Sequence, residues 1–451
     1  MSIGVIHISQ PLTSEEEHQV REWSNKYYQK LKTMKCVTDK RLFGIEIEYS
    51  VVDKKEQLQL HSSEYLQKKL EQYPIVSELG SYQIEINPGP REFSQAALQA
   101  LSNDIKNYVH VLNQSSSENN MHLAPIGLPF YLDSTFFQTQ QVFTQKLRYN
   151  VSKNYFGSWN AKGTIVPYQQ KGSVLLPGDS GVTVINELHV QLQALDLSDL
   201  IKLFNYSQML SPVCIALGAN SGITNGQPLV HREQQITIFE ETEGICDGIQ
   251  NIPRVGLFPG YINHIDEYMD VALSFRPLYF PDENNQWKSF DLQLGSYYAW
   301  TRIRHDRVPV PHFRIEFRPL STQPSLNENI ALSEFFIQSL LSLLDNKVSL
   351  IPEEFLLSNF QSSVKHAMQA TLLWPDGKSV SYQPVYKIIE NLLNTMPTTS
   401  YIHYLLPRIK QQLSPTEWLI KKTKDDGYQT AINMYYQSVH ENSPLVKEER
   451  K

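Results

Sequence analysis

Glutamate, histidine and arginine side chains recur at every second position of four short segments, a spacing that could hold metal ions and phosphates. The segments are FGIEIEYSV, SYQIEIN, NELHVQLQ and HFRIEFRP. In a β-strand, residues i and i+2 point to the same face, so each segment predicts one apolar face and one polar face. The polar faces carry Glu46 and Glu48; Gln83, Glu85 and Asn87; Glu187, His189, Gln191 and Gln193; and His312, Arg314, Glu316 and Arg318.

The chemistry of these polar faces differs from that of an ordinary solvent face, because they contain no lysine. Two carboxylates on one strand face repel each other, and such a pair implies a cation or an arginine partner. Carboxylate oxygens with an imidazole nitrogen suit Mg²⁺ or Mn²⁺. Arg314 and Arg318 flank Glu316 and could contact phosphate in a bidentate manner. Together these groups could carry out phosphoryl transfer.

Simpler explanations exist for each feature taken alone. A single strand of this kind is more often the solvated face of an antiparallel sheet. A lone histidine such as His189 is more often structural, and Glu78, in an ELG turn, could simply cap that turn. Four segments with the same bias favour a site.

The elements that must position these faces follow from periodicity and capping signals. Apolar residues three or four positions apart predict helices, and alternation predicts strands. Residues 131–180 show no clear period and are expected to form an irregular cover or substrate loop. The predicted elements are a helix over 14–35 opened by Ser14 and Glu17, a strand over 42–52, a helix over 92–112, a strand over 182–193, a helix over 198–210, short strands and turns over 221–312, a strand over 313–318, a helix opened by Ser325 and Glu328, and an almost wholly helical chain from 335 onwards.

Composition limits the class of protein. The chain has 451 residues, 41% of them hydrophobic, which is typical of a globular protein with a large core. The net charge of −7 disfavours nucleic-acid binding. Three scattered cysteines predict free thiols in a reducing compartment. The beginning MSIGVIHISQPLTSEEE does not look like a secretion signal, and no run of about 18 apolar residues predicts a membrane span, so a cytoplasmic location is expected.

The ordered series of motifs resembles the glutamate–cysteine ligase and carboxylate–amine ligase family. It runs GIEIEYSVVD, SELGSYQIEINPGP, NELHVQLQ, SPVCIALGANS, ITIFEE and FRIEFRPLSTQPS, from Gly44 to Ser325. The resemblance implies a fold similar to that of glutamine synthetase: an α+β fold whose curved, mostly antiparallel sheet forms a half-funnel, with helices outside and a helical C-terminal region. The expected division is an N-terminal helix (1–40), a catalytic domain (41–345) and a C-terminal helical region (346–451).

The resemblance also implies roles for individual residues. Glu46, Glu48, Glu78, Glu85, His189 and Glu316 match metal ligands, and Glu316 is also expected to be catalytic together with Arg314 and Arg318. Arg302 and Arg304, in AWTRIRHDR, are expected to bind phosphate or substrate. Gln191, where relatives often carry another histidine or polar residue, is assigned to cofactor binding.

The activity implied is an ATP- and Mg²⁺-dependent carboxylate–amine ligase that forms an amide through an acyl phosphate. Two or three Mg²⁺ ions are expected, with Mn²⁺ as a substitute. The expected partners are a small carboxylate, first of all glutamate as a γ-glutamyl donor, and an amino acid or other amine. No nucleic-acid or membrane partner is expected, and a homo-oligomer is possible. Two alternatives stay open: an inactive nucleotide-binding member of the family, and a metal-dependent amide hydrolase.

Overall fold

A computed structural model describes residues 11–34, 36–281, 285–308, 310–376, 379–396 and 401–447. Its centre is an eight-stranded sheet in which all neighbouring strands are antiparallel. The strand order is β13 (Thr301–Asp306), β14 (His312–Ser321), β8 (Glu187–Gln193), β1 (Leu42–Asp53), β3 (Gln83–Ile86) and β2 (Ile75–Ser77), with β4 (Arg91–Glu92) and β5 (Met121–Ala124) also paired to β1.

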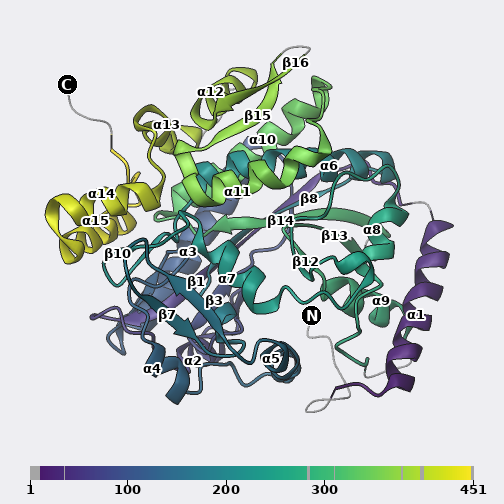
Figure 1. Cartoon of the computed structure of the whole chain (residues 1–451), viewed down its shortest axis with the longest axis horizontal. Coiled ribbons are helices and arrows are strands. Elements are labelled where there is room, and N and C mark those ends of the chain that lie inside the picture. Colours follow the sequence, from purple (N-terminus) through teal and green to yellow (C-terminus); the bar gives the residue numbers. More distant parts are fainter. Residues whose placement is uncertain are drawn as a thin grey trace.

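The apolar faces of the four predicted strands pack against helices and form the main core. The helices on this side are α3 (Gln95–Ser117), α6 (Leu197–Gly218) and α10 (Leu326–Asp345). Figure 1 shows α6 and α10 on one side of β8 and β14. Ile47, Val190 and Phe317 are fully buried, and Phe317 stacks on Phe336 of α10 with ring centroids 4.0 Å apart. The predicted α+β class, a mainly antiparallel sheet covered by helices, is confirmed.

The N-terminal helix α1 (Ser14–Lys32) packs on α9 (Gln286–Gly295) through aromatic side chains. Tyr27 and Phe290 lie 5.3 Å apart, centroid to centroid. The helix is present as predicted, but its capping box is formed by Thr13 and Glu16 rather than by Ser14 and Glu17. Two overlapping capping patterns stand one residue apart in this sequence, and the Thr13 side chain accepts the hydrogen bond from the backbone N–H of Glu16.

The expectation of an irregular segment over 131–180 is wrong. Helix α5 was not predicted because its buried residues Tyr149, Val151 and Phe156 do not lie on one face, so its apolar residues do not recur at helical spacing. The segment contains α4 (Ser134–Thr139), α5 (Leu147–Trp159), the hairpin β6 (Thr164–Pro167) and β7 (Ser173–Leu176), and a 3₁₀ helix (Ser180–Thr183). That 3₁₀ helix also shortens the predicted 182–193 strand, which begins at Glu187.

The remaining elements include helices where only short strands and turns were expected. Between 221 and 312 lie β9 (Ile223–Thr224), β10 (Gln227–Pro228), α7 (Gln234–Glu243), a 3₁₀ helix (Ile249–Asn251), β11 (Val255–Gly256), α8 (Ile265–Ala272) and β12 (Tyr298–Ala299), and α2 (Ser62–Lys69) follows β1. The helix opened by Ser325 and Glu328 is present, with the predicted capping box.

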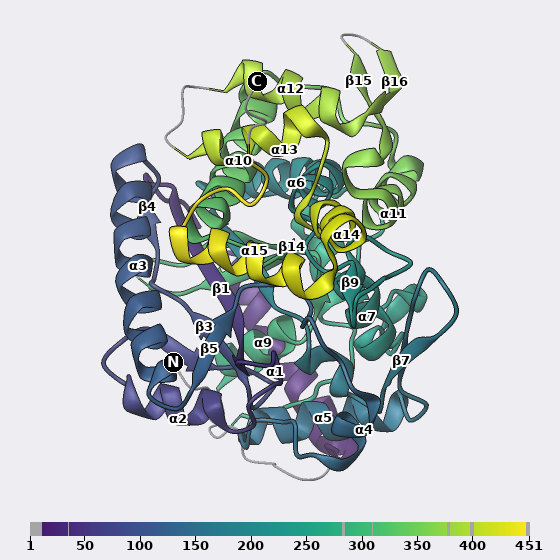
Figure 2. The same ribbon diagram turned by 90° about the vertical axis from the view of Figure 1, so that its left-hand side faces the viewer.

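The C-terminal region is mostly helical, but it contains one β-hairpin, β15 (Thr371–Asp376) and β16 (Ser379–Pro384), that was not predicted. Arg408 and Glu328, both fully buried, form an ion pair at 2.6 Å that joins this region to α10. Figure 2 shows its last helices crossing the front of the molecule near β9. The domain boundaries at 40 and 345 stay a prediction. The helices are α11 (Leu356–His366), α12 (Val385–Thr395), α13 (Leu406–Gln411), α14 (Pro415–Asp426) and α15 (Tyr428–Glu441), with 3₁₀ turns at Glu353–Phe355, Ala367–Gln369 and Ile402–Tyr404.

Helix α6 is long and apolar enough to cross a membrane, by length and composition alone. In the fold, however, 78% of its most apolar window is buried, between the sheet and the helices α10 and α11. Its apolar character is therefore explained by its place in the core.

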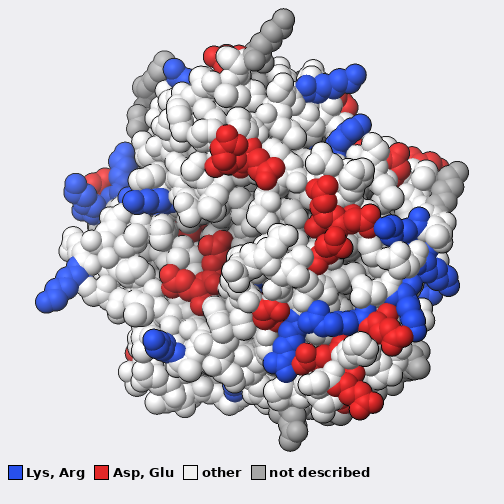
Figure 3. Space-filling model, turned by 45° about the vertical axis from the view of Figure 1, so that its right-hand side comes forward, with Lys and Arg blue, Asp and Glu red and all other residues white. Residues whose placement is uncertain are grey.

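On the face shown in Figure 3, Lys and Arg form a band at the lower right, and Asp and Glu lie in several separate groups. The basic band at the lower right adjoins acidic side chains. On α1, Lys26 pairs with Glu22 at 2.5 Å and Lys32 pairs with Asp266 at 2.8 Å.

Candidate active site

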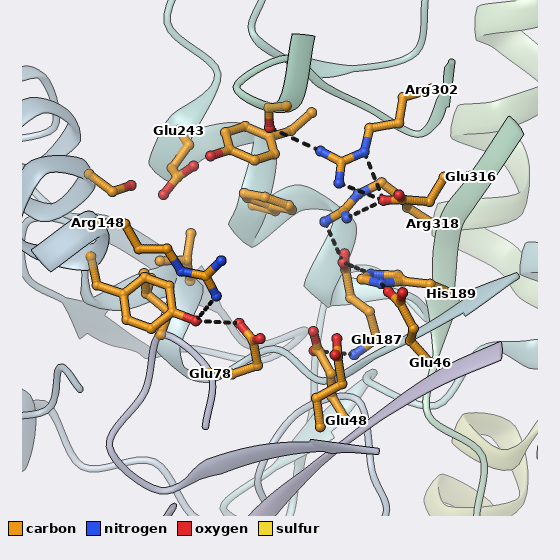
Figure 4. Close-up of a pocket in the computed structure, with 18 of the residues that line it drawn as sticks. Glu46, Glu48, Glu78, Arg148, Glu187, His189, Glu243, Arg302, Glu316 and Arg318 are labelled. Atoms are coloured by element: carbon orange, nitrogen blue, oxygen red, sulfur yellow. Dashed lines mark hydrogen bonds and ion pairs between the residues drawn. The ribbon is translucent and has the colours of Figure 1, made fainter. Parts of the chain in front are cut away.

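The polar side of the sheet lines a cavity of about 330 Å³. Figure 4 shows its charged residues pointing toward one another from strands that are far apart in sequence. We call the charged residues that the strands contribute to the lining the sheet wall: Glu46, Glu48, Glu85, Glu187, His189, Arg302, Arg304, Glu316 and Arg318.

The antiparallel register explains why these residues meet. Glu46 of β1 lies opposite His189 of β8, and Glu48 lies opposite Glu85 of β3. On the other side of β8, Arg302 of β13 lies opposite Glu316 of β14. Directly opposed residues share a face, so the ladder places four separate polar faces side by side.

Arg318 lies beside a break in the ladder and reaches Glu187. The register between β8 and β14 shifts between Phe317 and Leu320, and Pro319, which has no N–H to donate, occupies this irregularity. The Arg318 guanidinium donates to a Glu187 oxygen at 2.8 Å and to a Glu316 oxygen at 3.0 Å. It thereby links the two ends of the sheet wall.

Two overlapping groups of side chains have ligand atoms close enough to hold metal ions. One comprises Glu46, Glu85 and His189, and the other Glu48, Glu187 and His189; within each group the ligand atoms lie within 4.8 Å of one another. One oxygen of Glu187 is buried without a hydrogen-bond partner among the described residues. Carboxylates with one imidazole, and a buried oxygen left unsatisfied, fit a hard divalent cation such as Mg²⁺ or Mn²⁺.

Burial and mutual repulsion act on the carboxylates of β1 and β3. Burial, reinforced by the charges of Glu187 and Glu78, raises the pKa of Glu48 to about 8. Burial and the charge of Glu46 raise the pKa of Glu85 well above its usual range. Without a cation these acids therefore hold protons more readily than exposed glutamates do.

The acids beside the arginines respond in the opposite way. Burial opposes their ionisation, but Arg302 and Arg318 outweigh it and hold the pKa of Glu316 well below its usual value. Arg318 and His189 likewise lower the pKa of Glu187. The sheet wall thus contains firmly ionised carboxylates next to readily protonated ones.

His189 sits between the two metal-ligand groups. Its Nε2 lies 2.6 Å from a Glu187 oxygen and its Nδ1 lies 3.1 Å from a Glu46 oxygen. Burial and the charge of Arg318 oppose its protonation, but these two hydrogen bonds outweigh them, so the pKa of His189 lies well above its usual value. A divalent cation would compete with that proton for the same carboxylates.

Two further arginines line the cavity, each anchored by an acid. Arg302 donates through Nε to Glu316 at 2.7 Å, and Arg304 approaches Asp291 of α9 at 3.4 Å. The Nε groups of Arg304 and Arg318 are buried and have no partner among the described residues. These guanidiniums are held in place and still have N–H groups to offer.

The structure does not bring every predicted site residue to the cavity. Arg314 and Gln191 bond to each other and lie outside the cavity lining, and the guanidinium of Arg314 is paired with Asp306 of β13. Glu78 does line the cavity, and its carboxylate accepts a hydrogen bond from the Tyr149 hydroxyl at 3.3 Å. The predicted roles of all three residues stay predictions.

A second group of lining residues, which we call the helix wall, was missed from sequence: Arg148, Tyr149 and Ser152 of α5, and Phe239 and Glu243 of α7. Figure 4 shows Arg148 and Glu243 across the cavity from Glu316 and His189. The Arg148 side chain is exposed to the cavity and donates to the Tyr149 hydroxyl at 2.5 Å. Glu187 was predicted to lie on the same polar face as His189 but was given no role in the site; the structure places it in the cavity lining.

The chain belongs to the glutamate–cysteine ligase family 2, whose family model matches residues 42–372. Family membership supports a carboxylate–amine ligase as the class of protein. The comparison with curated protein sequences found no match.

Solved structures show the same fold at low sequence identity. Glutamate–cysteine ligase from Francisella tularensis, in complex with AMP, is 13% identical with a TM-score of 0.50, and the match covers 93% of this chain and 97% of that chain. A bifunctional glutathione synthetase from Pasteurella multocida is 12% identical with a TM-score of 0.50; the match covers 95% of this chain but 55% of that one.

Proposed function

We propose that this protein is an ATP- and Mg²⁺-dependent ligase that activates a carboxylate as an acyl phosphate and joins it to an amine. The observation that carries the proposal is the meeting of Glu46, Glu48, Glu187, His189 and Glu316 with Arg302 and Arg318 in one cavity. A hydrolase needs a metal-bound water but no array of arginines, so the guanidiniums favour phosphate handling.

Metal ions would be held by the sheet wall. Glu46, Glu85 and His189 are the proposed ligands of one ion, and Glu48 and Glu187 those of a second, with His189 between them. When bound, such ions neutralise the charge of the β,γ-phosphates and polarise the γ-phosphoryl group. We propose Glu78 and Glu316 as further ligands, so that the wall could hold two or three ions.

The chain's own side chains would do the remaining work on the phosphates. Arg318 and Arg302 converge on Glu316 and would clamp the γ-phosphoryl group as it leaves ADP for the carboxylate. We propose the same task, at the edge of the site, for Arg304, and a supporting role through Asp306 for Arg314. Gln191, which donates to Glu46 at 2.6 Å, would orient that metal ligand.

Helix α5 would exclude water from the acyl phosphate. Its residues Arg148, Tyr149 and Ser152 line the cavity opposite the sheet wall. An acyl phosphate hydrolyses when water reaches it, so a ligase must cover the reacting carbon.

We further propose glutamate as the donor, through its γ-carboxylate, and an amino acid or other amine as the acceptor. We also propose a cytoplasmic location: all three cysteines are free, with Cys36 and Cys214 buried. A homo-oligomer is compatible with these proposals.

The test is ADP release by the full chain with ATP, Mg²⁺, glutamate and a panel of amines, each reaction repeated with EDTA. The proposal expects ADP release that requires metal, glutamate and amine together, with amide formed in equal amount. Glu316→Gln should abolish release, and Glu241→Gln, on the exposed side of α7, should not.

Other outcomes would identify the alternatives. Carboxamide hydrolysis that needs metal but no ATP would establish the hydrolase. ATP binding without any turnover across the panel would establish an inactive family member. Either result contradicts the ligase.

A further inference from the structure

Two acidic side chains at the helix wall form no ion pair with any residue that the structure describes. Glu243, in the last turn of α7, lines the cavity, and Asp179, just before the 3₁₀ helix at 180–183, lies beside it; each is 3% exposed. In the described part of the chain, both oxygens of Asp179 lack a hydrogen-bond donor. Buried carboxylates are normally paired with a cation or several donors, so this pair requires another explanation.

A shared proton accounts for the pair. Two adjacent carboxylates cannot both ionise in a buried place, and a carboxyl that keeps its proton can donate it to the other. Burial and the charge of Glu243 raise the pKa of Asp179 well above its usual range. Burial raises the pKa of Glu243 to about 8. A shared proton would also supply the donor that the Asp179 oxygens otherwise lack.

With one shared proton the pair keeps a net negative charge, and the surrounding side chains do not neutralise it. The positive groups act through space, without an ion pair to either carboxyl among the described residues. Lys153 of α5 faces Asp179, while Arg254, Arg318 and Glu187 face Glu243, whose uncharged titratable neighbours are Tyr279 and Tyr298.

We propose that Glu243 binds the ammonium group of the acceptor and takes its proton, and that Asp179 is a positioning residue that shares the proton with it. This inference rests on the proposed ligase function and adds a step to it. An acceptor amine is an ammonium ion near neutral pH and has no lone pair to attack with. Glu243 faces the cavity across from the sheet wall, where the acyl phosphate would form.

The step balances. One proton passes from the ammonium nitrogen to the Glu243 carboxylate, and the freed lone pair forms the C–N bond to the acyl carbon. The C–O bond to phosphate breaks with its electron pair on the phosphate oxygen. The second proton on nitrogen leaves with the released phosphate. The products are the amide, hydrogen phosphate (HPO4²⁻) and a doubly protonated carboxyl pair, which later returns one proton to solvent.

Hydroxylamine separates this role from a structural one, because it is unprotonated at neutral pH and traps acyl phosphates as hydroxamates without a base. In Glu243→Gln we expect amide formation with ammonium-type acceptors to fall about 100-fold or more, while hydroxamate formation stays within about twofold of wild type. Glu241→Gln is the matched control: it removes the same charge from the same helix at an exposed position.

Asp179→Asn supplies a second reading. This variant should lower amide formation less than Glu243→Gln does. The basic limb of the pH profile of amide formation should also move, because Glu243 no longer shares a proton with a second carboxyl. Thermal unfolding of each variant checks that the fold is intact. Equal loss of amide and hydroxamate in Glu243→Gln would overturn the proton role, and so would unchanged amide formation. If the wild-type protein forms no hydroxamate from ATP and any tested carboxylate, the ligase proposal itself fails, and this inference with it.

Discussion

The sheet wall and the helix wall of the cavity handle charge in opposite ways. On the sheet wall, Glu46, Glu187 and Glu316 are each paired with a histidine or an arginine of the same wall, and Arg318 joins Glu187 to Glu316. On the helix wall, Arg148 has no carboxylate partner within ion-pair distance among the described residues, and Glu243 has no cation. A wall whose charges are mutually anchored is suited to hold metal ions and phosphate at fixed positions. A wall with available charges is suited to bind a charged organic substrate.

This comparison predicts the largest effect for a metal ligand of the sheet wall. Glu48→Gln should lower turnover by about 1000-fold or more while the chain stays folded, because the amide keeps the hydrogen bond from the Glu187 N–H but cannot neutralise a cation. Steady-state ADP release and circular dichroism measure the two halves of this prediction. Turnover near the wild-type rate would show that Glu48 is not a metal ligand.

A smaller loss is expected for the arginine that bridges the sheet wall. Arg318→Lys should lower kcat about 100-fold, because a lysine cannot contact Glu187, Glu316 and a phosphoryl group with one planar fork. The KM for ATP should change less than kcat. Near-normal kcat would show that the two acids, rather than the guanidinium, define the site.

The helix wall should respond in KM rather than in kcat. Arg148→Gln should raise the KM of the carboxylate or the amino-acid acceptor about tenfold, because a charged hydrogen bond to substrate is lost while the metal site is untouched. Lys171→Gln, exposed in the turn between β6 and β7, is the control. A loss in kcat at constant KM would place Arg148 with the phosphate-handling groups. The two walls would then not divide substrate binding from phosphate handling.

The smallest expected effect is on stability and concerns pH. Burial raises the pKa of Glu48 to about 8 from 4.5, so the folded state binds its proton more tightly than the unfolded state does. That stabilisation is present in full below about pH 4.5 and is lost as the pH rises through about 8. Glu48→Gln should therefore make the metal-free protein more stable than wild type at about pH 8.5, by about 1–3 kcal/mol, with little difference at about pH 4.5.

Unfolding in EDTA at the two pH values measures this difference, and Glu241→Gln again serves as control. Addition of Mg²⁺ should reverse the sign at high pH, because the ion stabilises only the chain that keeps its carboxylate. A wild-type protein whose stability rises steadily from about pH 4.5 to about pH 8.5 without metal would contradict the argument.

Much of the sheet wall was predictable because strand periodicity is a local property. Alternation in FGIEIEYSV and NELHVQLQ was enough to place Glu46 and His189 on polar faces, and the structure joins those faces through one antiparallel register. The capping box of Ser325 and Glu328 was also predicted from the sequence, and the structure confirms it. The box at the first helix was placed one residue late, because two capping patterns overlap there.

Tertiary structure alone decided the helix wall. Helix α5 has no apolar stripe on one side, and Glu243 stands in an ordinary acidic run, so neither Arg148 nor Glu243 carries a periodic signal. The same holds for the register shift of β14 beside Arg318. The chain by itself determined which side chains share a strand face, since that depends on neighbours two residues apart. Which faces meet, and what lies across from them, depends on contacts between different strands and helices, such as that of Glu46 with His189, 143 positions apart, and no local pattern records those.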